Sequence, residues 1–316
     1  MTMPTRLLAD TGVRITELGF GAASLGNLYR ETSETDARAA VDEAWDRGIR
    51  YFDTAPHYGL GLSERRLGAT LAGRPRDDYV LSTKVGRLLV PNEHPTGRDP
   101  DFVVPDDLRR HWDFSRDGIL RSLEQSLDRL GVDSVDILYL HDPDQHDERS
   151  AWLGAETLAE LKSQGVIRAR GVGTNSGAQL PALFEADAID VAMLAGRYTL
   201  LEQDDAALAS AAATGKSIVA VGVFNSGLLA TDRPPATATY DYGQASEEIL
   251  ARATRLADRC AASGVSLPQA AIAFPLRHES VANVTLGMRD AGQVARNVEL
   301  YAAGVDPSVW QQLLSR

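Results

Sequence analysis

Short apolar runs rich in β-branched residues alternate with longer amphipathic stretches along the whole chain. An apolar run of four to eight residues between polar loops is typical of a buried strand, and apolar residues spaced three and four apart are typical of a helix packed on one face. Runs of the first kind occur eight times, at residues 17–21, 49–53, 79–84, 135–141, 169–173, 191–195, 217–222 and 284–287. Helical spacing lies between them, for example at residues 35–47, 115–130, 152–164, 203–214 and 249–262.

Strands that alternate with helices predict parallel pairing through right-handed crossovers. A doubly wound sheet and a closed barrel both satisfy this order, but eight repeats in 316 residues favour the barrel. We therefore predict an α/β fold, a (β/α)8 TIM barrel that forms a single domain over residues 1–316. Residues 6–18 differ, because two short apolar runs flank Asp10-Thr11-Gly12. This pattern predicts an N-terminal β-hairpin, which could plug the bottom of the barrel.

Two long stretches lack a clear period. The larger, residues 86–114, contains four prolines, several charges and Trp112. It directly follows the third predicted strand, so on a barrel it would lie over the active-site mouth. A long loop in a compact domain is usually functional or disordered. The second irregular stretch, residues 231–244, follows the seventh strand.

The charge balance narrows the range of partners. The formal net charge is −12, and an acidic chain repels phosphate backbones and anionic lipid. We therefore expect neither nucleic acid nor a membrane surface as a partner. Residues 1–10 hold no long apolar run, so no signal peptide is predicted. No window reaches the ~20 apolar residues of a membrane span, and we expect a soluble, cytoplasmic protein.

The single cysteine, Cys260, excludes an intramolecular disulfide and a cysteine metal cage. It lies in a predicted helix, where filling the core is its expected role. A metal-dependent hydrolase barrel is disfavoured, because the first strand carries no His-x-His pair and the chain has no close Cys/His spacing. We predict no metal site.

Side chains of catalytic types end three neighbouring strands. Asp53, Lys84 and His141 close the second, third and fourth predicted strands, and Tyr58 lies five residues past Asp53. The C-terminal strand ends of a barrel share one mouth, so all four side chains should converge there. Each has a structural alternative, since Asp53 could cap a loop, Lys84 could be solvated, and Tyr58 or His141 could pack. Their joint placement favours a catalytic group.

Burial dictates the chemistry of this group. Lys84 closes the apolar run 79–81, and a buried ammonium needs a carboxylate partner, which Asp53 on the adjacent strand can supply. A free phenol has a pKa near ~10, and a buried cation beside Tyr58 would bring its proton exchange closer to neutral pH. His141 would orient a substrate oxygen. Proton transfer of this kind needs a hydride partner, which indicates a bound cofactor.

Several motifs together resemble the aldo-keto reductase superfamily, and the resemblance covers nearly the whole chain. They are Gly19-Phe20-Gly21, Tyr51-Phe52-Asp53-Thr54-Ala55-Pro56-His57-Tyr58-Gly59, Ser82-Thr83-Lys84, Leu140-His141-Asp142, Gly171-Val172-Gly173-Thr174-Asn175, Ser226-Gly227-Leu228-Leu229 and the segment 287–297. The resemblance implies a barrel that binds NAD or NADP without a Rossmann domain, and a catalytic tetrad of Asp53, Tyr58, Lys84 and His141. Residues 113–115, 195–203 and 224–227 resemble bacterial sugar 1-dehydrogenases. That group includes L-fucose, D-threo-aldose and L-galactose dehydrogenases and the similar pyridoxal 4-dehydrogenase, which oxidise a cyclic hemiacetal to a lactone.

The resemblance also implies ligands for the cofactor. Asn175 would hold the nicotinamide carboxamide, residues 224–228 would wrap the pyrophosphate with backbone N–H groups, and residues 293 and 297 would contact adenine. The full expected set is Gly21, Asn175, Phe224, Asn225, Ser226, Gly227, Leu228, Gly287, Arg289, Gln293 and Asn297.

The chain departs from the family's pattern at three cofactor positions. Ala195 stands where a glutamine is frequent, and Val221 lies near the place where an aromatic residue often stacks on the nicotinamide. Gly287 replaces the lysine that usually binds the 2′-phosphate. Arg289 could take over that role, so NAD use, NADP use and dual use are all compatible with the sequence.

We predict an NAD(P)-dependent dehydrogenase that oxidises an aldose such as L-fucose, D-arabinose or L-galactose at C1, with Tyr58 as the base. A general aldehyde or ketone reductase and pyridoxal 4-dehydrogenase are the enzymatic alternatives. A cofactor-sensing subunit is the non-enzymatic alternative, mildly disfavoured because the chain shows no added domain or long charged tail. Trp112 could contact the sugar or pack within its loop. The candidate substrate contacts are Asn27, Tyr29, His57, Trp112 and Asp142.

Overall fold

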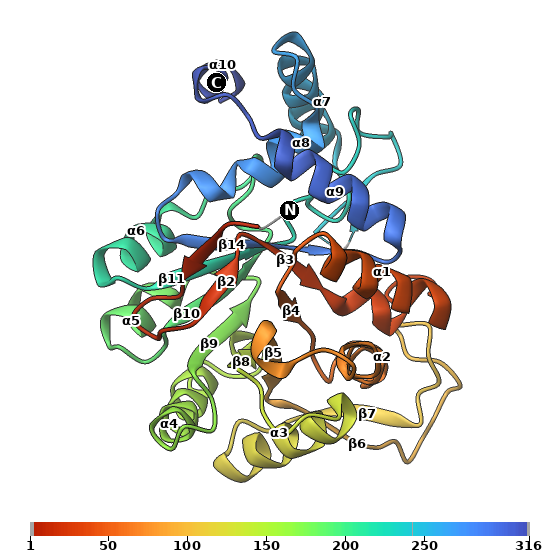
Figure 1. The fold of residues 1–316 in the computed structure, drawn as a ribbon, viewed down its shortest axis with the longest axis vertical. Coiled ribbons are helices and arrows are strands. Elements are labelled where there is room, and N and C mark those ends of the chain that lie inside the picture. Colours follow the sequence, from red (N-terminus) through yellow and green to blue (C-terminus); the bar gives the residue numbers. More distant parts are fainter. Residues whose placement is uncertain (1–2, 242, 315–316) are drawn as a thin grey trace.

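The computed structural model describes residues 3–241 and 243–314, and within them eight parallel strands close into a barrel, as the sequence predicts (Figure 1). The barrel strands are Leu18–Gly21 (β3), Tyr51–Asp53 (β4), Val80–Val85 (β5), Ile137–His141 (β8), Ala169–Thr174 (β9), Val191–Ala195 (β10), Ser217–Val221 (β11) and Val281–Gly287 (β14). They follow one another around the barrel in chain order, and β14 pairs with β3 to close it. The C-terminal ends of all eight strands therefore meet at one mouth.

Helices surround the strands (Figure 1). Their bounds are Glu34–Asp46 (α1), Leu62–Leu71 (α2), Arg116–Leu130 (α3), Ser150–Ser163 (α4), Leu180–Glu185 (α5), Asp205–Thr214 (α6), Glu247–Ala262 (α7), Leu267–Ala273 (α8), Ala291–Ala303 (α9) and Trp310–Leu313 (α10). Local sequence fixes several starts, since Ser33 and Ser115 accept hydrogen bonds from the backbone N–H groups of Asp36 and Gly118. Such caps satisfy donors that the first helical turn leaves unpaired.

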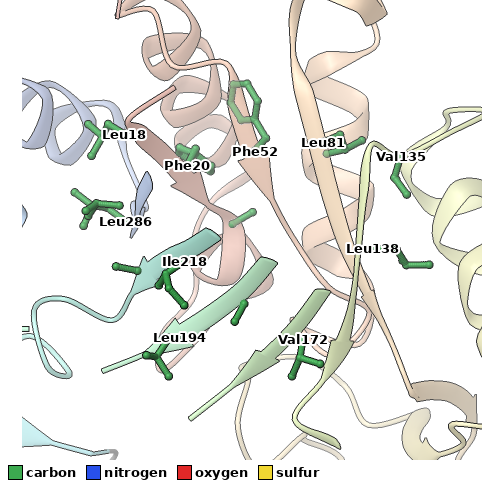
Figure 2. Packing of buried hydrophobic residues seen from close by; sticks show 14 of the residues in the cluster. Leu18, Phe20, Phe52, Leu81, Val135, Leu138, Val172, Leu194, Ile218 and Leu286 are labelled. Carbon is green, nitrogen blue, oxygen red and sulfur yellow. The ribbon is translucent and has the colours of Figure 1, made fainter. Parts of the chain in front are cut away.

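Two apolar layers hold the barrel. The outer layer lies between strands and helices, and Figure 2 shows part of it, including Phe52, Leu138 and Ile218 on different strands. Alternate residues of the same strands, among them Tyr51 and Tyr139, belong to a separate buried cluster. This arrangement follows from the period of two along each strand. Cys260 on α7 is buried in a further apolar cluster, which fits its expected role.

The N-terminal hairpin is present. Strands Thr5–Leu7 (β1) and Arg14–Thr16 (β2) pair antiparallel. Leu8, Val13 and Ile15 join the buried cluster that holds Tyr51 and other residues of the barrel strands. The backbone N–H of residue 9 donates to Ser217 Oγ at the N-terminal start of β11, at 2.8 Å. The hairpin thus closes the bottom of the barrel, opposite the mouth.

Strand β14 begins earlier than the apolar pattern predicts, at Val281 instead of residue 284. The reason is a buried polar residue, Asn283, which interrupts the apolar run. Its side-chain amide donates to the carbonyl of Thr16 at 2.6 Å, and its oxygen accepts from Thr285 Oγ1 at 2.6 Å. A polar side chain satisfied in this way can sit within a strand without opening the core.

The prediction that residues 86–114 are irregular is wrong for both ends of that stretch. Arg87–Pro91 (β6) and Leu108–Trp112 (β7) form an antiparallel pair that brings Arg87 opposite Trp112. The arginines and histidine of β7 alternate between exposed and half-buried positions, so the strand shows little apolar character in sequence. In residues 231–244 the structure describes only a two-stranded pair, Thr239–Tyr240 (β12) and Gly243–Gln244 (β13).

No helix among residues 3–241 and 243–314 is both long enough and apolar enough to cross a bilayer.

We predict that Gly68→Ala destabilises the fold. A Cβ at Gly68 on α2 would lie 2.0 Å from the backbone oxygen of Leu130 at the end of α3, so the two helices must move apart. Overpacking of this kind costs about 1–3 kcal/mol, and the free energy of unfolding in urea would measure it. Gly73→Ala is the matched control, because a Cβ there meets nothing within 4 Å. Equal stability of the two variants would contradict the packing.

Candidate active site

Three neighbouring strands and one loop bring the predicted tetrad together. Asp53 ends β4, Lys84 lies one residue before the end of β5, and His141 ends β8. Lys84 Nζ lies 2.6 Å from Asp53 Oδ2 and donates to the carbonyl of Thr54 at 2.9 Å. The same nitrogen lies 4.8 Å from the centroid of the Tyr58 ring, which is 5.8 Å from the His141 ring. The predicted convergence on one mouth is therefore found.

Close backbone packing positions Tyr58. Its loop presses against the turn 22–26, where a Cβ on Gly59 would lie 2.3 Å from the carbonyl oxygen of Gly26. Gly59 also has φ +63°, a conformation that residues with a side chain adopt at a cost. The carbonyl of Tyr58 accepts from the N–H of Ser63 on α2 at 3.2 Å. Only glycine at 26 and 59 allows this approach, so both positions support Tyr58.

A chain of buried hydroxyl groups orients Asp53. Ser82 Oγ donates to Asp53 Oδ1 at 2.7 Å, and the Tyr51 hydroxyl lies 3.0 Å from Ser82 Oγ and 3.2 Å from the Tyr139 hydroxyl. Ser82 precedes Lys84 by two residues, so both face the same side of β5. That period was visible in sequence, but sequence reasoning missed the role of Ser82.

Burial and charge act against each other on Lys84 and Tyr58. Burial is the largest single influence on Lys84 and disfavours its ammonium, but Asp53 and Tyr58 together outweigh burial and hold the pKa of Lys84 above its ordinary value. Burial raises the pKa of the Tyr58 phenol, and the Lys84 cation is the largest opposing influence. The sequence predicted that Lys84 lowers the pKa of Tyr58, but it did not reveal the larger, opposite effect of burial on that pKa. Lys84 therefore limits a rise in the pKa of Tyr58.

The two histidines at the mouth are neutral. Burial lowers the pKa of His141 well below its ordinary range, and the nearby Arg87 guanidinium adds to the effect. Burial and the cation of Arg110 act in the same direction on the pKa of His57. The two rings meet edge to face at 5.3 Å between centroids. A neutral imidazole can donate one hydrogen bond and accept one, which suits orientation of a substrate oxygen.

A cavity of about 630 Å³ lies over the tetrad. Three of the predicted substrate contacts line it, namely Tyr29, His57 and Asp142. Gly21, a predicted cofactor residue, lines it as well. The cavity also includes residues that the sequence did not single out, among them Arg87, Phe102 and Gln145.

The other two predicted substrate contacts do not line this cavity. Asn27 is buried, and its side chain binds the carbonyl of Val103, the N–H of Thr32 and the guanidinium of Arg66. Those bonds occupy the amide, so in this structure Asn27 holds a loop and does not face the cavity.

Trp112 packs instead against its own hairpin. Its ring stacks on Phe114 at 5.9 Å, and the guanidinium carbon of Arg87 lies 4.4 Å from its centroid. Of the two roles open in sequence, packing within the loop is the one the structure shows.

A second hollow of about 510 Å³ continues from the first, since Asn175, Gly222 and Gly287 line both. Most of the predicted cofactor residues line this trough, namely Asn175, Phe224, Asn225, Ser226, Gly227, Gly287, Gln293 and Asn297. Sequence reasoning missed Arg197, Tyr240, Asp241 and Arg296, which also line it. Arg197 and Asp241 form an ion pair at 3.3 Å between two loops of the trough. Nothing in the local sequence distinguishes these side chains from ordinary surface charges.

The segment 224–228 matches its prediction only in part. Leu228 is fully buried in an apolar cluster and does not line the trough. The N–H groups of Asn225, Gly227 and Leu228 bond to carbonyls within residues 222–225, which leaves fewer backbone donors for a phosphate than predicted. Asn225 and Ser226 both have positive φ, at 46° and 57°. Non-glycine residues in this conformation are uncommon and often mark binding loops.

Arg289 is held away from the trough. Its guanidinium donates to the carbonyls of Leu28 at 2.6 Å and Arg30 at 2.8 Å, and also bonds to Thr32 Oγ1. These bonds use the guanidinium that could otherwise bind a 2′-phosphate. Arg289 instead anchors the loop that places Leu28 and Tyr29 at both cavities.

Within the described residues, no group of three or more His, Cys, Asp or Glu side chains is arranged to hold a metal ion.

The Aldo/keto reductase family model matches residues 17–315. The match spans almost the whole chain, and the chain belongs to this family of NAD(P)-dependent oxidoreductases. Membership, together with relatives named as dehydrogenases, supports an enzyme and disfavours the cofactor-sensing alternative.

Three curated relatives are similar over nearly their whole length. D-threo-aldose 1-dehydrogenase of a Pseudomonas species is 48% identical over 313 residues, covering 96% of this chain and 95% of that protein. Pyridoxal 4-dehydrogenase of Microbacterium luteolum is 40% identical, covering 98% and 96%. L-galactose dehydrogenase of Arabidopsis thaliana is 29% identical, covering 95% and 90%.

Solved structures share the fold. The holo form of an aldo-keto reductase from Bacillus halodurans matches with a TM-score of 0.79 at 29% identity, covering 99% of this chain and 97% of that chain. A glycerol dehydrogenase from Gluconobacter oxydans matches with a TM-score of 0.78 at 22% identity, covering 99% and 94%.

We predict that Asp53→Asn moves the alkaline limb of the pH profile to lower pH. The Asp53 carboxylate raises the pKa of Lys84, so its loss lets burial lower that pKa, and Lys84 loses its charge sooner as the pH rises. The shift should be at least about one pH unit, measured as kcat/KM for alcohol oxidation from neutral to alkaline pH.

Asp190→Asn is the matched control for this change. Asp190 is buried and lies 2.8 Å from Lys162 Nζ, and neither residue lines the cavity over the tetrad. Its variant should keep the wild-type alkaline limb even if it is less stable. An unmoved limb in Asp53→Asn would show that the pair does not govern the charge of Lys84.

Proposed function

We propose that the protein oxidises an aldose at C1 to its lactone, using NAD or NADP and the tetrad Asp53, Tyr58, Lys84 and His141. The observation that carries this proposal is the buried Lys84–Asp53 pair beside the Tyr58 ring, at the floor of a cavity that continues into a trough. A phenol beside a buried cation is equipped for proton transfer.

The trough fits a dinucleotide. Asn225 Oδ1 is buried there and has no hydrogen-bond partner within the described chain, which suits a bound ligand with donor groups. Asn175, at the boundary of the two cavities, would hold the nicotinamide carboxamide, and Gln293 and Asn297 on α9 would face the adenine. When bound, the nicotinamide supplies the hydride acceptor that the side chains of the site lack.

Each member of the tetrad has a separate task. Tyr58 accepts the proton of the anomeric hydroxyl, which becomes the carbonyl oxygen of the lactone. Lys84 stabilises the phenolate, and Asp53 keeps Lys84 charged. His141, neutral at the mouth, hydrogen-bonds the substrate oxygen without competing for its proton. Proton transfer by a positioned side chain contributes roughly 10²–10⁴-fold to the rate.

The relatives indicate the substrate class. D-threo-aldose 1-dehydrogenase and L-galactose dehydrogenase are named for sugars, so L-fucose, D-arabinose and L-galactose are the first aldoses to test. The 40% identity to pyridoxal 4-dehydrogenase favours pyridoxal as a second candidate, because it also presents a cyclic hemiacetal. A general aldehyde or ketone reductase remains the third candidate, through the same four residues.

Tyr58→Phe should abolish turnover but spare nucleotide binding. The change removes only the phenolic oxygen, so proton transfer is lost while the trough is intact. We expect kcat for aldose oxidation to fall roughly 10²–10⁴-fold, with an unchanged nucleotide Kd from fluorescence titration. Initial rates on L-fucose, L-galactose, D-arabinose and pyridoxal, with each nucleotide, would establish the substrate.

Two results would count against this proposal. Wild-type turnover in Tyr58→Phe would overturn the mechanism. Reduction of simple aldehydes by the wild type, with no oxidation of any aldose or pyridoxal, would leave the general reductase in place of the sugar dehydrogenase.

Arg296, not Arg289, should discriminate between NAD and NADP. Arg296 lines the trough beside Gln293 and Asn297, whereas the guanidinium of Arg289 is bonded to the loop 28–32. Arg296→Ala should therefore weaken NADP⁺ relative to NAD⁺ by about tenfold, the effect of one charged contact to phosphate. Arg289→Ala should weaken both nucleotides alike. Equal effects of Arg296→Ala on the two Kd values would contradict this assignment.

A further inference from the structure

A second buried ion pair faces the cavity, next to the tetrad but separate from it. Asp142 follows His141 at the end of β8, and its carboxylate Oδ2 bonds to the guanidinium of Arg87, the first residue of β6. Both side chains are about nine-tenths buried, with 10% and 12% of their surfaces exposed, and both line the cavity. Arg87 also lies 3.1 Å from Gln145 Oε1.

The pair is associated with three unfavourable features: a strained backbone, burial of both charges and an unpaired donor. Asp142 has φ 45°, in the left-handed region, and burial raises the pKa of its carboxyl to about 6. Arg87 Nε is buried and makes no hydrogen bond within the described chain. Replacing a buried ion pair by apolar residues is often neutral or stabilising, so stability alone is weak grounds for keeping one. Strained residues and unsatisfied donors of this kind concentrate at binding sites.

The Trp112 ring packs against the guanidinium of Arg87. The guanidinium carbon lies 4.4 Å from the indole centroid, and β6 and β7 place these two residues directly opposite each other. The hairpin that sequence reasoning treated as irregular therefore holds one half of the pair. The other half comes from the barrel itself, so the pair joins the hairpin to the mouth.

The cations that line the cavity are each paired with a carboxylate. Lys84 is paired with Asp53 at 2.6 Å, and Arg87 with Asp142. Asp101, the remaining lining carboxylate, lies 3.8 Å from Arg110, which is bonded to Asp99 at 2.5 Å, and both histidines are neutral. No lining cation among the described residues is left to neutralise a substrate phosphate or carboxylate. The cavity is polar and has no surplus of positive charge.

We propose that the Arg87–Asp142 pair is the specificity element for neutral, polyhydroxylated substrates and acts against anionic ones. A hydroxyl group both donates and accepts, and adjacent hydroxyls can donate to the Asp142 carboxylate while accepting from the Arg87 guanidinium. The carboxylate and the guanidinium together complement the donors and acceptors of a diol. Either charge alone would instead attract a group of the opposite charge. This inference rests on the proposed function for the identity of the sugar and names the residues that recognise its hydroxyls.

The test compares three aldehydes under the reducing activity of the family. D-Glyceraldehyde and propanal have the same carbon chain and differ by two hydroxyls, and succinic semialdehyde carries a carboxylate. We would measure kcat/KM for each with the wild type, Asp142→Asn and Arg87→Gln. Arg116→Gln is the matched control, because Arg116 pairs with Glu160 on the outer helices at 2.6 Å.

The wild type should prefer glyceraldehyde to propanal and act poorly on succinic semialdehyde. Both pair variants should lose at least about tenfold in kcat/KM on glyceraldehyde, through KM, and keep their rate on propanal. Asp142→Asn leaves Arg87 uncompensated and should gain activity on succinic semialdehyde, whereas Arg87→Gln should not. Arg116→Gln should match the wild type throughout. Thermal unfolding and nucleotide Kd would confirm that the variants are folded.

Three results would overturn the assignment. They are a wild type without preference for glyceraldehyde, equal losses on glyceraldehyde and propanal, and no gain on succinic semialdehyde in folded Asp142→Asn. Failure of the proposed function is distinguishable, because it would appear as a wild type that oxidises none of L-fucose, L-galactose, D-arabinose and pyridoxal with either nucleotide. The aldehyde preferences would then still decide the role of the pair.

Discussion

The buried contact between Lys84 and Asp53 is the constraint on which the rest of the site depends. An ammonium without a counterion inside the barrel would lose its proton, and an isolated carboxylate would gain one. At 2.6 Å each opposes the effect of burial on the other, although burial still raises the pKa of Asp53. Ser82 donates to the carboxylate, and Tyr51 in turn bonds to Ser82. The phenol of Tyr58 is the group that benefits, because burial alone would hold its proton too tightly for exchange near neutral pH.

Much of the fold could be predicted because its period is local. The eight strands and the N-terminal hairpin follow from apolar runs separated by polar segments. The β6–β7 hairpin could not be found in this way, because its strands hold arginine and histidine at half-exposed positions and lie among prolines. The early start of β14 could not be predicted for a related reason. Asn283 is a buried polar residue, and the hydrogen bond from its amide to Thr16 forms only in the folded barrel.

The site residues also fall into those that the sequence could place and those that it could not. Asp53, Lys84 and His141 could be located from sequence because they lie at or near strand ends, and Tyr58 follows Asp53 closely, which is why the tetrad converges as predicted. Other side chains could not be placed, because their direction depends on tertiary contacts. The polar groups of Asn27 and Arg289 bond to neighbouring backbone, and Trp112 packs against Arg87. The pairing of Arg87 with Asp142 could not be predicted either, because it depends on the β6–β7 hairpin. The result is a polar cavity without an unpaired cation next to the buried tetrad, which is the basis of the proposed preference for uncharged hydroxylated substrates.

Lys84 lowers the pKa of Tyr58 against the effect of burial. Titration of protein labelled with ¹³C at the tyrosine hydroxyl carbon, followed by NMR, would measure that pKa directly, with the Tyr58 signal assigned by its absence in Tyr58→Phe. Comparison with Lys84→Met removes the cation but keeps an apolar stem of similar length. The pKa of Tyr58 should be higher in Lys84→Met than in the wild type. An equal or lower pKa in the variant would show that Lys84 does not lower the pKa of Tyr58.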